Sequence, residues 1–413
     1  MKYSRFNAYR HASCFSLKVK GFILLLWMIT GLFSCKLHAF DNEALIPAAW
    51  QTEVYVPLIE DKRVAFAGNH TATIAGTHLV DSLLQSGINI VKVFSPEHGF
   101  RGEAAAGEWV DSDTDSQTGL PVISLYGATR RPTREQLKDV DVILFDIQDV
   151  GARFYTYISW MTYIMEEAAL AGLPVIILDR PNPNGHYIDG PLLEPEYASY
   201  VGLHPVPVVH GMTIGEYAMM VNGEGWLTGG LECDLNVITV KNYTHGSRYS
   251  LPLPPSPNLQ NMHAIYLYPS LCFFEGTEIS VGRGTDKAFQ VFGHPGLPQN
   301  HYPYSFVPES VRAAPNPPHL NTVCHGLDLS VTAIDRLAEQ TQINLSYLLE
   351  AYQHFPEKER FFNNFFERLA GTSRLREQII AGYTEEEIRK SWQDDLESFQ
   401  RIRSKYLLYP DFK

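Results

Sequence analysis

The stretch Val140-Asp-Val-Ile-Leu-Phe-Asp146 decides the fold class, because it is a continuous apolar run that ends in a carboxylate. Such a run is typical of a strand in a parallel sheet that is covered on both faces. Similar runs lie at residues 63–69, 88–94 and 173–179. Several strands of this kind in one chain favour an α/β fold over an all-helical one.

Helix-like segments alternate with these strands. Apolar residues recur at helical spacing around residues 78–84 and over residues 157–171, where Gly172 provides a helix stop. The alternation predicts a doubly wound parallel sheet of the Rossmann-like type. No G-x-G-x-x-G sequence follows the first strand, so the glycine fingerprint of dinucleotide binding is absent.

A proline-dense segment, Ser250-Leu-Pro-Leu-Pro-Pro-Ser-Pro257, reads as a linker because it suits neither a helix nor a central strand. We therefore predict a Rossmann-like catalytic domain over residues 40–255 and a smaller α+β domain over residues 256–413. Helices are expected near its end, at 345–354, 361–370 and 384–404, the last opening with the capping box of Thr384 and Glu387.

The first 39 residues have the layout of a secretory signal. Lys18 and Lys20 precede an apolar run over residues 22–33, and the first acidic residue is Asp41. Cleavage after Ala39 would release the protein into the periplasm or the medium, whereas lipidation of Cys35 would anchor it to a membrane. An uncleaved anchor is the alternative to both, and the oligomeric state is left open.

The charge and the cysteines exclude some functions. With a formal net charge of −13, nucleic acid is not an expected partner, and an anionic substrate would need a local cluster of arginines. Cys233, Cys272 and Cys324 are far apart, so they predict neither a disulfide framework nor a zinc site. Apolar neighbours make Cys272 a structural thiol.

Polar residues follow each predicted strand. Because parallel strands place their carboxyl ends at one edge, these loops should converge on a single crevice. From them we predict contacts with the substrate by the following residues: Asn69, His98, Arg101, Gln148, Arg153, Tyr155, Arg180 and Asn182. For Arg180 and Asn182 the alternative is a braced crossover loop.

Two carboxylates at this edge are candidates for catalysis. Glu97 lies in the tight loop Ser95-Pro-Glu-His-Gly99, where a carboxylic acid could serve as a general acid that protonates a leaving oxygen. The alternative is a carboxylate that only caps a turn. Asp146 ends a buried strand, where it could act in catalysis or form a structural brace with an arginine such as Arg153.

The predicted second domain contributes Glu275 and Arg283, within the glycine-containing segment Phe274-Glu-Gly-Thr-Glu-Ile-Ser-Val-Gly-Arg-Gly-Thr285. Glycines allow a backbone to approach a ligand closely, so this segment could face the crevice. Histidines raise the question of a metal, but their spacing matches no ligand motif, and we predict neither a metal nor a cofactor.

Five ordered blocks of the chain resemble the exo-β-N-acetylmuramidase (NamZ-type) family, formerly a domain of unknown function. The blocks are Phe94-Ser-Pro-Glu-His-Gly-Phe-Arg-Gly102, Leu125-Tyr-Gly127, Asp146-Ile-Gln-Asp-Val-Gly-Ala-Arg-Phe-Tyr-Thr-Tyr157, Leu178-Asp-Arg-Pro-Asn-Pro183, and Glu275-Gly-Thr277 with Gly282-Arg-Gly-Thr285. The resemblance implies a Rossmann-like domain joined to a smaller α/β domain, with the active cleft between them. It also implies release of N-acetylmuramic acid from the non-reducing ends of peptidoglycan fragments, with Glu97 as the catalytic residue.

The sequence does not identify the second catalytic group. Asp146 or Glu275 could act on water, or the N-acetyl group of the substrate could take that part. The lactyl carboxylate of muramic acid needs a cation, for which Arg153, Arg180 and Arg283 are candidates. A non-catalytic protein that binds wall fragments and a metal-dependent esterase or amidase are the competing functions.

Overall fold

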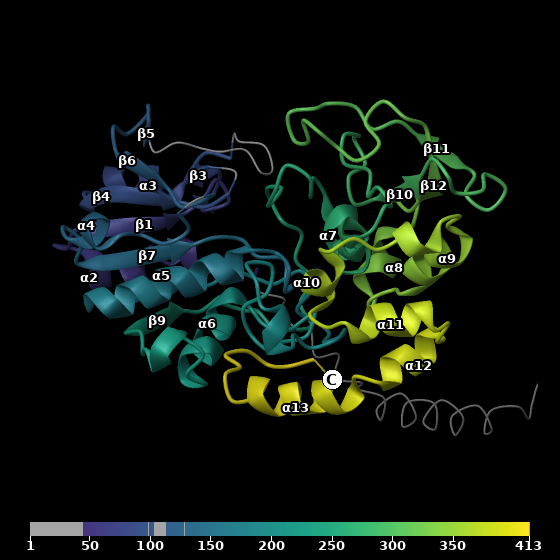
Figure 1. The fold of residues 1–413 in the computed structure, drawn as a ribbon. Helices are drawn as coiled ribbons and strands as arrows, with labels where there is room; N and C mark the ends of the chain where they lie inside the picture. The colour runs from purple at the N-terminus through teal and green to yellow at the C-terminus, as the bar shows by residue number, and fades with distance from the viewer. Residues whose placement is uncertain (1–43, 98, 103–112, 128, 413) are drawn as a thin grey trace, which may run out of the picture. The chain divides into compact units, whose positions relative to one another are not determined.

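A seven-stranded sheet forms the centre of the N-terminal half of the chain (Figure 1). The computed structural model describes residues 44–97, 99–102, 113–127 and 129–412. The sheet order is β5-β6-β4-β1-β7-β8-β9, and all neighbours are parallel except β5 and β6. Without β5, the strands in chain order lie as 3-2-1-4-5-6, which is the Rossmann order. The strands are β1 (Val64–Gly68), β4 (Ile90–Ser95), β5 (Asp113–Thr114), β6 (Pro121–Ser124), β7 (Val142–Asp146), β8 (Val175–Leu178) and β9 (Leu235–Ile238).

Both faces of this sheet are buried, as the continuous apolar runs predict. In β7, Ile143 and Phe145 face one core cluster, while Val142 and Leu144 face the other. Helices α5 and α6 contribute to the first cluster, and α2 and α3 to the second. The Rossmann-like fold class is therefore confirmed. The helices and the small hairpin of this half are α2 (Thr52–Ile59), α3 (Leu79–Gln85), α4 (Arg134–Leu137), α5 (Tyr157–Ala171), α6 (Ile214–Gly223), β2 (Thr73–Ile74) and β3 (Thr77–His78).

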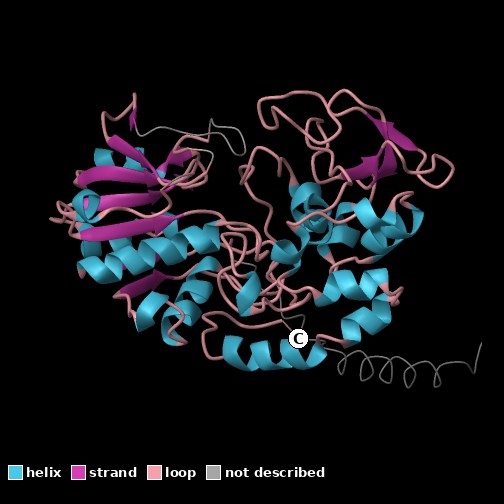
Figure 2. Cartoon of the chain, in the orientation of Figure 1, coloured by secondary structure: helices cyan, strands magenta, loops and turns pink. Residues whose placement is uncertain are grey.

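The C-terminal half combines many short helices with a three-stranded antiparallel sheet, in the order β10-β12-β11 (Figure 2). Its long first helix, α7, begins at Met262 with the Asn261 side chain accepting a hydrogen bond from the backbone N–H of Ala264. The elements are α7 (Met262–Leu271), β10 (Val291–His294), β11 (Tyr304–Phe306), β12 (Cys324–Asp328), α8 (Ile334–Ala338), α9 (Ser346–His354), α10 (Phe366–Ala370), α11 (Arg374–Ile380), α12 (Glu385–Lys390) and α13 (Gln393–Arg403).

Two helices predicted for this half differ from the structure. The helix expected over residues 361–370 begins only at Phe366, because Phe361 and Phe362 pair with the backbone of Thr277 and Glu278 instead. The helix expected over residues 384–404 is two helices, α12 and α13, which are separated at Ser391 and the buried Trp392. The capping box of Thr384 and Glu387 is present as predicted.

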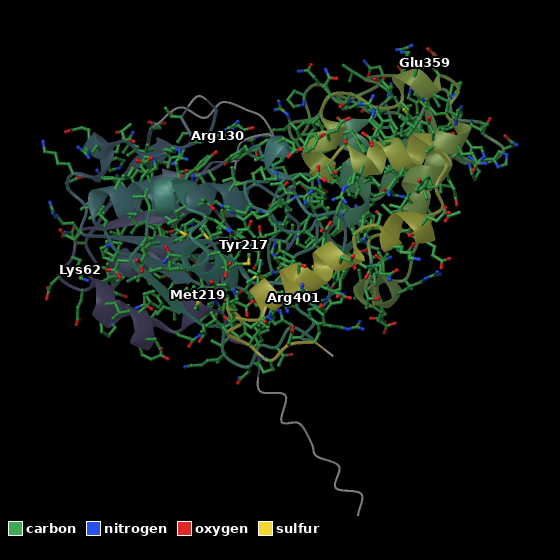
Figure 3. The ribbon with its side chains drawn as sticks, turned by 60° about the horizontal axis from the view of Figure 1, so that its bottom comes forward. Lys62, Arg130, Tyr217, Met219, Glu359 and Arg401 are labelled. Atoms are coloured by element: carbon green, nitrogen blue, oxygen red, sulfur yellow. The ribbon has the colours of Figure 1, made fainter. Side chains whose placement is uncertain are left out.

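The hydrophobic core continues from the sheet into the C-terminal half, because one cluster holds residues of β7 and α5 together with residues of α7 and α10. Residues from Leu45 onward form one compact unit. Tyr217 of α6 lies inside it, whereas Glu359 and Arg401 lie at its surface (Figure 3). The predicted domain boundary at residue 255 stays a prediction.

The predicted signal segment lies outside the described residues. In the part of the chain that is described, no helix is long and apolar enough to cross a membrane. Cleavage after Ala39 and lipidation of Cys35 therefore remain predictions from the sequence.

We expect Gly68→Ala to destabilise the fold by about 1–3 kcal/mol through overpacking. Gly68 ends β1, and a Cβ added there would lie 2.2 Å from the backbone oxygen of Asp146 and 2.6 Å from the ring of Phe66. Gly246→Ala is the matched control, since its added Cβ would meet nothing closer than Thr244 Oγ1 at 3.7 Å. Chemical denaturation measures both, and an equal midpoint for the two variants would contradict this packing.

Candidate active site

A cavity of about 850 Å³ lies between the carboxyl edge of the sheet and the C-terminal half. One wall comes from the loops after β4, β6 and β7, and the other from α7 and the segment that follows it. Residues 312–318, together with Phe365 and Leu369, contribute further to the lining. Its polar and aromatic lining includes Glu97, Tyr126, Tyr155, Tyr157, Tyr268, Cys272, Glu275, Arg283, Phe289 and Arg312.

Glu97 is held where β4 ends. The backbone N–H of Gly99 donates to the carbonyl of Pro96 at 3.2 Å, which makes the tight turn that the sequence predicts. Tyr126, which follows β6, is hydrogen-bonded to the Glu97 side chain. Burial and the charge of Glu97 raise the pKa of Tyr126, so its hydroxyl keeps its proton. A phenol thus orients the carboxyl group at the cavity wall.

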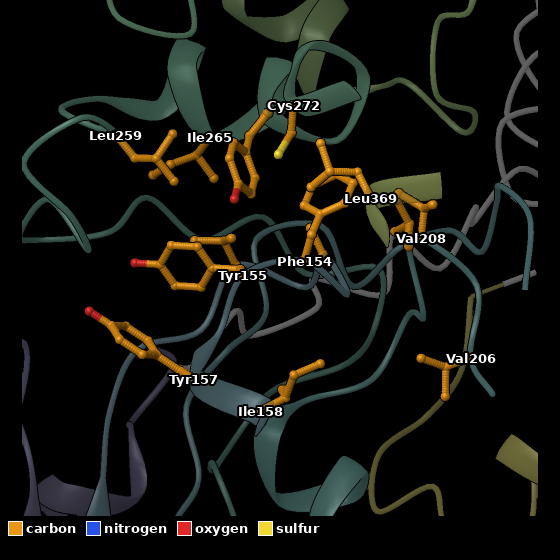
Figure 4. Close-up of a cluster of buried hydrophobic side chains, with 14 of the residues drawn as sticks. Phe154, Tyr155, Tyr157, Ile158, Val206, Val208, Leu259, Ile265, Cys272 and Leu369 are labelled. Atoms are coloured by element: carbon orange, nitrogen blue, oxygen red, sulfur yellow. The ribbon is translucent and has the colours of Figure 1, made fainter. Parts of the chain in front are cut away.

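Two tyrosines make the wall beside Glu97. The hydroxyls of Tyr155 and Tyr157 point the same way (Figure 4) and both donate to the carbonyl of Pro255, at 2.9 and 3.2 Å. Burial raises the pKa of both hydroxyls. Asn69, which was predicted to contact the substrate, is buried and does not line the cavity, but its Nδ2 donates to the Tyr157 hydroxyl at 2.9 Å. The result is a fixed aromatic surface that a sugar ring can contact.

The proline-dense segment covers the crevice of the sheet. Besides the Pro255 carbonyl, the carbonyl of Pro254 lies 2.8 Å from Nε2 of His70, in the loop after β1. The loops after β1 and β7 flank the point where the strand order reverses. The segment predicted as a linker is therefore hydrogen-bonded to the loops on both sides of that point.

The opposite wall carries an ion pair. Arg283 Nε donates to Glu275 Oε1 at 2.6 Å, and the guanidinium lies 5.0 Å from the centre of the Phe289 ring. Both side chains are 24% exposed. Cys272 donates to Glu275 at 3.6 Å, and burial together with Glu275 raises the pKa of its thiol well above the ordinary value. The thiol is therefore neutral and buried, as the sequence predicts for a structural cysteine.

Family models cover both halves of the chain. Residues 64–263 match the model described as "Exo-beta-N-acetylmuramidase NamZ, N-terminal", and residues 266–409 match the corresponding C-terminal model. The chain belongs to the NamZ family. Peptidoglycan beta-N-acetylmuramidase NamZ of Bacillus subtilis (strain 168) is 40% identical over 376 residues, which cover 85% of this chain and 90% of that protein.

Solved structures agree with this family assignment. A DUF1343 family protein from Bacteroides fragilis NCTC 9343 is 48% identical, with a TM-score of 0.83, covering 89% of this chain and 99% of that one. A second protein of that family from the same organism is 30% identical, with a TM-score of 0.75, covering 88% and 99%. Both support the fold described above for this NamZ family member.

Four of the predicted site residues come together in the cavity of this NamZ family member: Glu97, Tyr155, Glu275 and Arg283. Asp146 and Arg180 do not line it. Arg180 Nη2 donates to Asp146 Oδ2 at 2.7 Å and its Nε binds the other carboxylate oxygen, with both side chains buried. This arrangement fits the structural alternative, with Arg180 rather than Arg153 as the partner of Asp146.

Three further predicted residues are buried outside the cavity lining, and each is held by backbone carbonyls. Gln148 Nε2 donates to Asp149 and Pro181, and Asn182 Nδ2 donates to Met212, all at 2.8 Å. Arg153 donates four bonds of 2.8 Å to the following carbonyls: Pro191, Val206, Leu369 and Ala370. Arg153 thus joins the sheet loops to α10.

Arg101 and His98 complete the predicted set. Arg101 forms ion pairs with Asp81 and Asp115, at 2.9 and 2.8 Å, and does not line the cavity. These pairs tie the loop after β4 to α3. His98 lies outside the described residues.

Sequence reasoning missed several residues that line the cavity. Tyr126, in the block Leu125-Tyr-Gly127, could have been predicted, because it follows β6 as Glu97 follows β4. Arg312 lies in an irregular segment without periodicity, which offers no such signal. No group of three or more histidine, cysteine, aspartate or glutamate side chains within the described ranges is arranged to hold a metal ion.

Proposed function

We propose that this NamZ family member is an exo-acting glycoside hydrolase that releases N-acetylmuramic acid from the non-reducing ends of peptidoglycan fragments. Membership in a family whose Bacillus subtilis relative is named a peptidoglycan beta-N-acetylmuramidase supports the substrate class. The observation that carries the proposal is the place of Glu97, a carboxyl group on the wall of a cavity lined largely by aromatic side chains. Its volume falls in the usual range for ligand pockets.

In this mechanism Glu97 donates its proton to the glycosidic oxygen, while Tyr126 holds the carboxyl group in place. Tyr155 and Tyr157 contact the sugar, and their bonds to Pro255 keep them fixed. Glu275 is better placed than Asp146 to act on water, because Glu275 lines the cavity and Asp146 is buried against Arg180. Arg283 orients Glu275 through their ion pair.

The test is product release from a defined substrate. We expect the full mature protein to release N-acetylmuramic acid from the disaccharide N-acetylmuramyl-β-1,4-N-acetylglucosamine, and to leave the disaccharide of reversed order intact. Binding without release would instead favour a wall-fragment binding protein. Release that stops with a chelator would favour the metal-dependent alternative.

We expect Glu275→Ala to lower kcat by about 100-fold, because a general base contributes about 10²- to 10⁴-fold. Azide should restore part of the rate and yield a glycosyl azide, since the shortened side chain leaves room for a small nucleophile. Mass spectrometry of the products measures this. A kcat equal to that of the wild type would assign the role to the N-acetyl group of the substrate.

We also propose that the leader exports the protein to the periplasm or the medium, with cleavage after Ala39 or lipidation of Cys35. Lysine and arginine residues before an apolar run support export. Cell fractionation with radiolabelled palmitate separates the two outcomes. Label that disappears in Cys35→Ala would establish the lipid anchor, and unlabelled protein in the soluble periplasmic fraction would establish free release.

A further inference from the structure

Among the described residues that line the cavity, one arginine has no bonded carboxylate. Two arginines and two glutamates line it: Arg283, Arg312, Glu97 and Glu275. Arg283 is neutralised by Glu275 at 2.6 Å. In the described part of the chain, the Arg312 guanidinium has no hydrogen-bond or ion-pair partner. When Glu97 is protonated, as a proton donor must be, the lining carries one net positive charge.

Arg312 is presented by a fixed turn. The backbones of Val311 and Ala314 bond reciprocally, at 3.2 and 2.9 Å, which leaves Arg312 and Ala313 at the tip. Buried Asn258 donates its Nδ2 to the carbonyl of Ala313 at 3.0 Å. The tip is therefore tied to the segment that covers the sheet, and little backbone freedom is lost when a ligand binds.

Gly284, next to Arg283, bonds to the loop that carries Arg312. Its carbonyl accepts from the backbone N–H of Glu309 at 2.9 Å, and its φ is +83°. An added Cβ would lie 2.5 Å from the Glu309 carbonyl oxygen and 2.7 Å from Cγ of Pro317. The glycine thus allows the loop that carries Arg312 to pack against the segment that carries Arg283.

The other arginines considered for a substrate carboxylate are engaged elsewhere. Arg153 and Arg180 are buried and bonded to the chain's own carbonyls and carboxylate. Arg130 does not line the cavity, and its guanidinium lies 4.1 Å from the centre of the Tyr200 ring. Of the described arginines that line the cavity, Arg312 is therefore the one that a ligand can reach without displacing a partner.

We propose that Arg312 binds the carboxylate of a carboxyalkyl ether on the bound amino sugar, and so selects N-acetylmuramic acid over N-acetylglucosamine. This inference rests on the proposed function and deepens it, because the two sugars differ by that carboxylate-bearing group. A guanidinium can form two parallel hydrogen bonds with a carboxylate. One bound anion then balances the net charge of the lining.

The experiment measures binding of the free monosaccharides by calorimetry, so it does not depend on turnover. We expect the wild type to bind N-acetylmuramic acid at least 10-fold more tightly than N-acetylglucosamine. Arg312→Gln should weaken binding of N-acetylmuramic acid by about 10- to 100-fold, the usual effect of losing a charged hydrogen bond, and leave N-acetylglucosamine unchanged. Arg312→Lys keeps the charge and should lose less.

Arg336→Gln is the matched control, because Arg336 is an exposed arginine of α8 that does not line the cavity. The methyl ester of N-acetylmuramic acid, which lacks the charge, provides a second measurement. We expect the wild type to bind this ester as weakly as Arg312→Gln binds the free acid. Equal affinity of wild type and Arg312→Gln for the acid, or an equal loss for both sugars, would overturn the inference. Arg312-dependent binding without any glycoside cleavage would overturn the proposed function and leave this inference standing.

Discussion

Glu97→Gln should lower kcat on the disaccharide N-acetylmuramyl-β-1,4-N-acetylglucosamine by about 10²- to 10⁴-fold, because a positioned proton donor contributes that much. Glutamine keeps the shape of the side chain and can still bond to Tyr126, but it has no acidic proton to give. The unfolding midpoint should stay within experimental error of the wild type, since the substitution leaves the packing around the cavity wall unchanged.

A graded series of leaving groups makes this test specific for proton donation. A sugar leaving group needs the proton, whereas a 4-nitrophenolate leaves with little help. The loss caused by Glu97→Gln should therefore be largest on the disaccharide and smallest on the 4-nitrophenyl glycoside. Glu278→Gln is the control, because Glu278 follows Glu275 closely in the chain but does not line the cavity. An equal loss on every leaving group would mean that Glu97 acts in binding, not as the acid.

Asp146→Ala should cost about 3–5 kcal/mol of unfolding free energy, because it leaves the guanidinium of Arg180 buried without a counter-charge. Asp146 is 0% exposed and Arg180 is 3% exposed. The same strand offers a control at its other end. Asp141, just before β7, pairs with Arg63 at 2.7 Å, but those side chains are 40% and 47% exposed.

Because water screens an exposed pair, Asp141→Ala should change stability little. Denaturant unfolding, followed by circular dichroism, compares the two variants. The double variant Asp146→Ala with Arg180→Met should recover much of the loss, since it removes the buried charge as well as its partner. A single variant Asp146→Ala as stable as Asp141→Ala would show that the carboxylate is not needed to hold Arg180.

The sheet could be predicted because each strand carries its own signal. The runs ending at Asn69, Phe94 and Asp146 are apolar on both faces, as a strand between two layers of helices requires. The helix over Tyr157–Ala171 was predicted with its observed bounds, because helical periodicity and Gly172 both mark it. The C-terminal half was harder, since residues 361 and 362 pair with a distant segment instead of continuing a helix.

Some residues of the candidate site could be predicted for a related reason. Topology brings the loops after the strands to one edge, so Glu97 and Tyr155 could be placed there. The strand order does not determine which side chains at this edge are buried by other parts of the chain. Asp146, Gln148 and Asn182 lie at that edge as well, but other parts of the chain fill the space above them. The position of Arg312 depends on Asn258 and Gly284, and such long-range packing leaves no local pattern.

The carbonyls of Pro254 and Pro255 occupy the place where many Rossmann folds receive a dinucleotide phosphate. An approaching phosphate would meet carbonyl oxygens there, which repel an anion, instead of the N–H groups that attract one. The strand order common to nucleotide-dependent enzymes serves here as a rigid platform, and the candidate site is the cavity farther out, at the junction with the C-terminal half. Fold resemblance to dehydrogenases is therefore a poor guide to what this sheet binds.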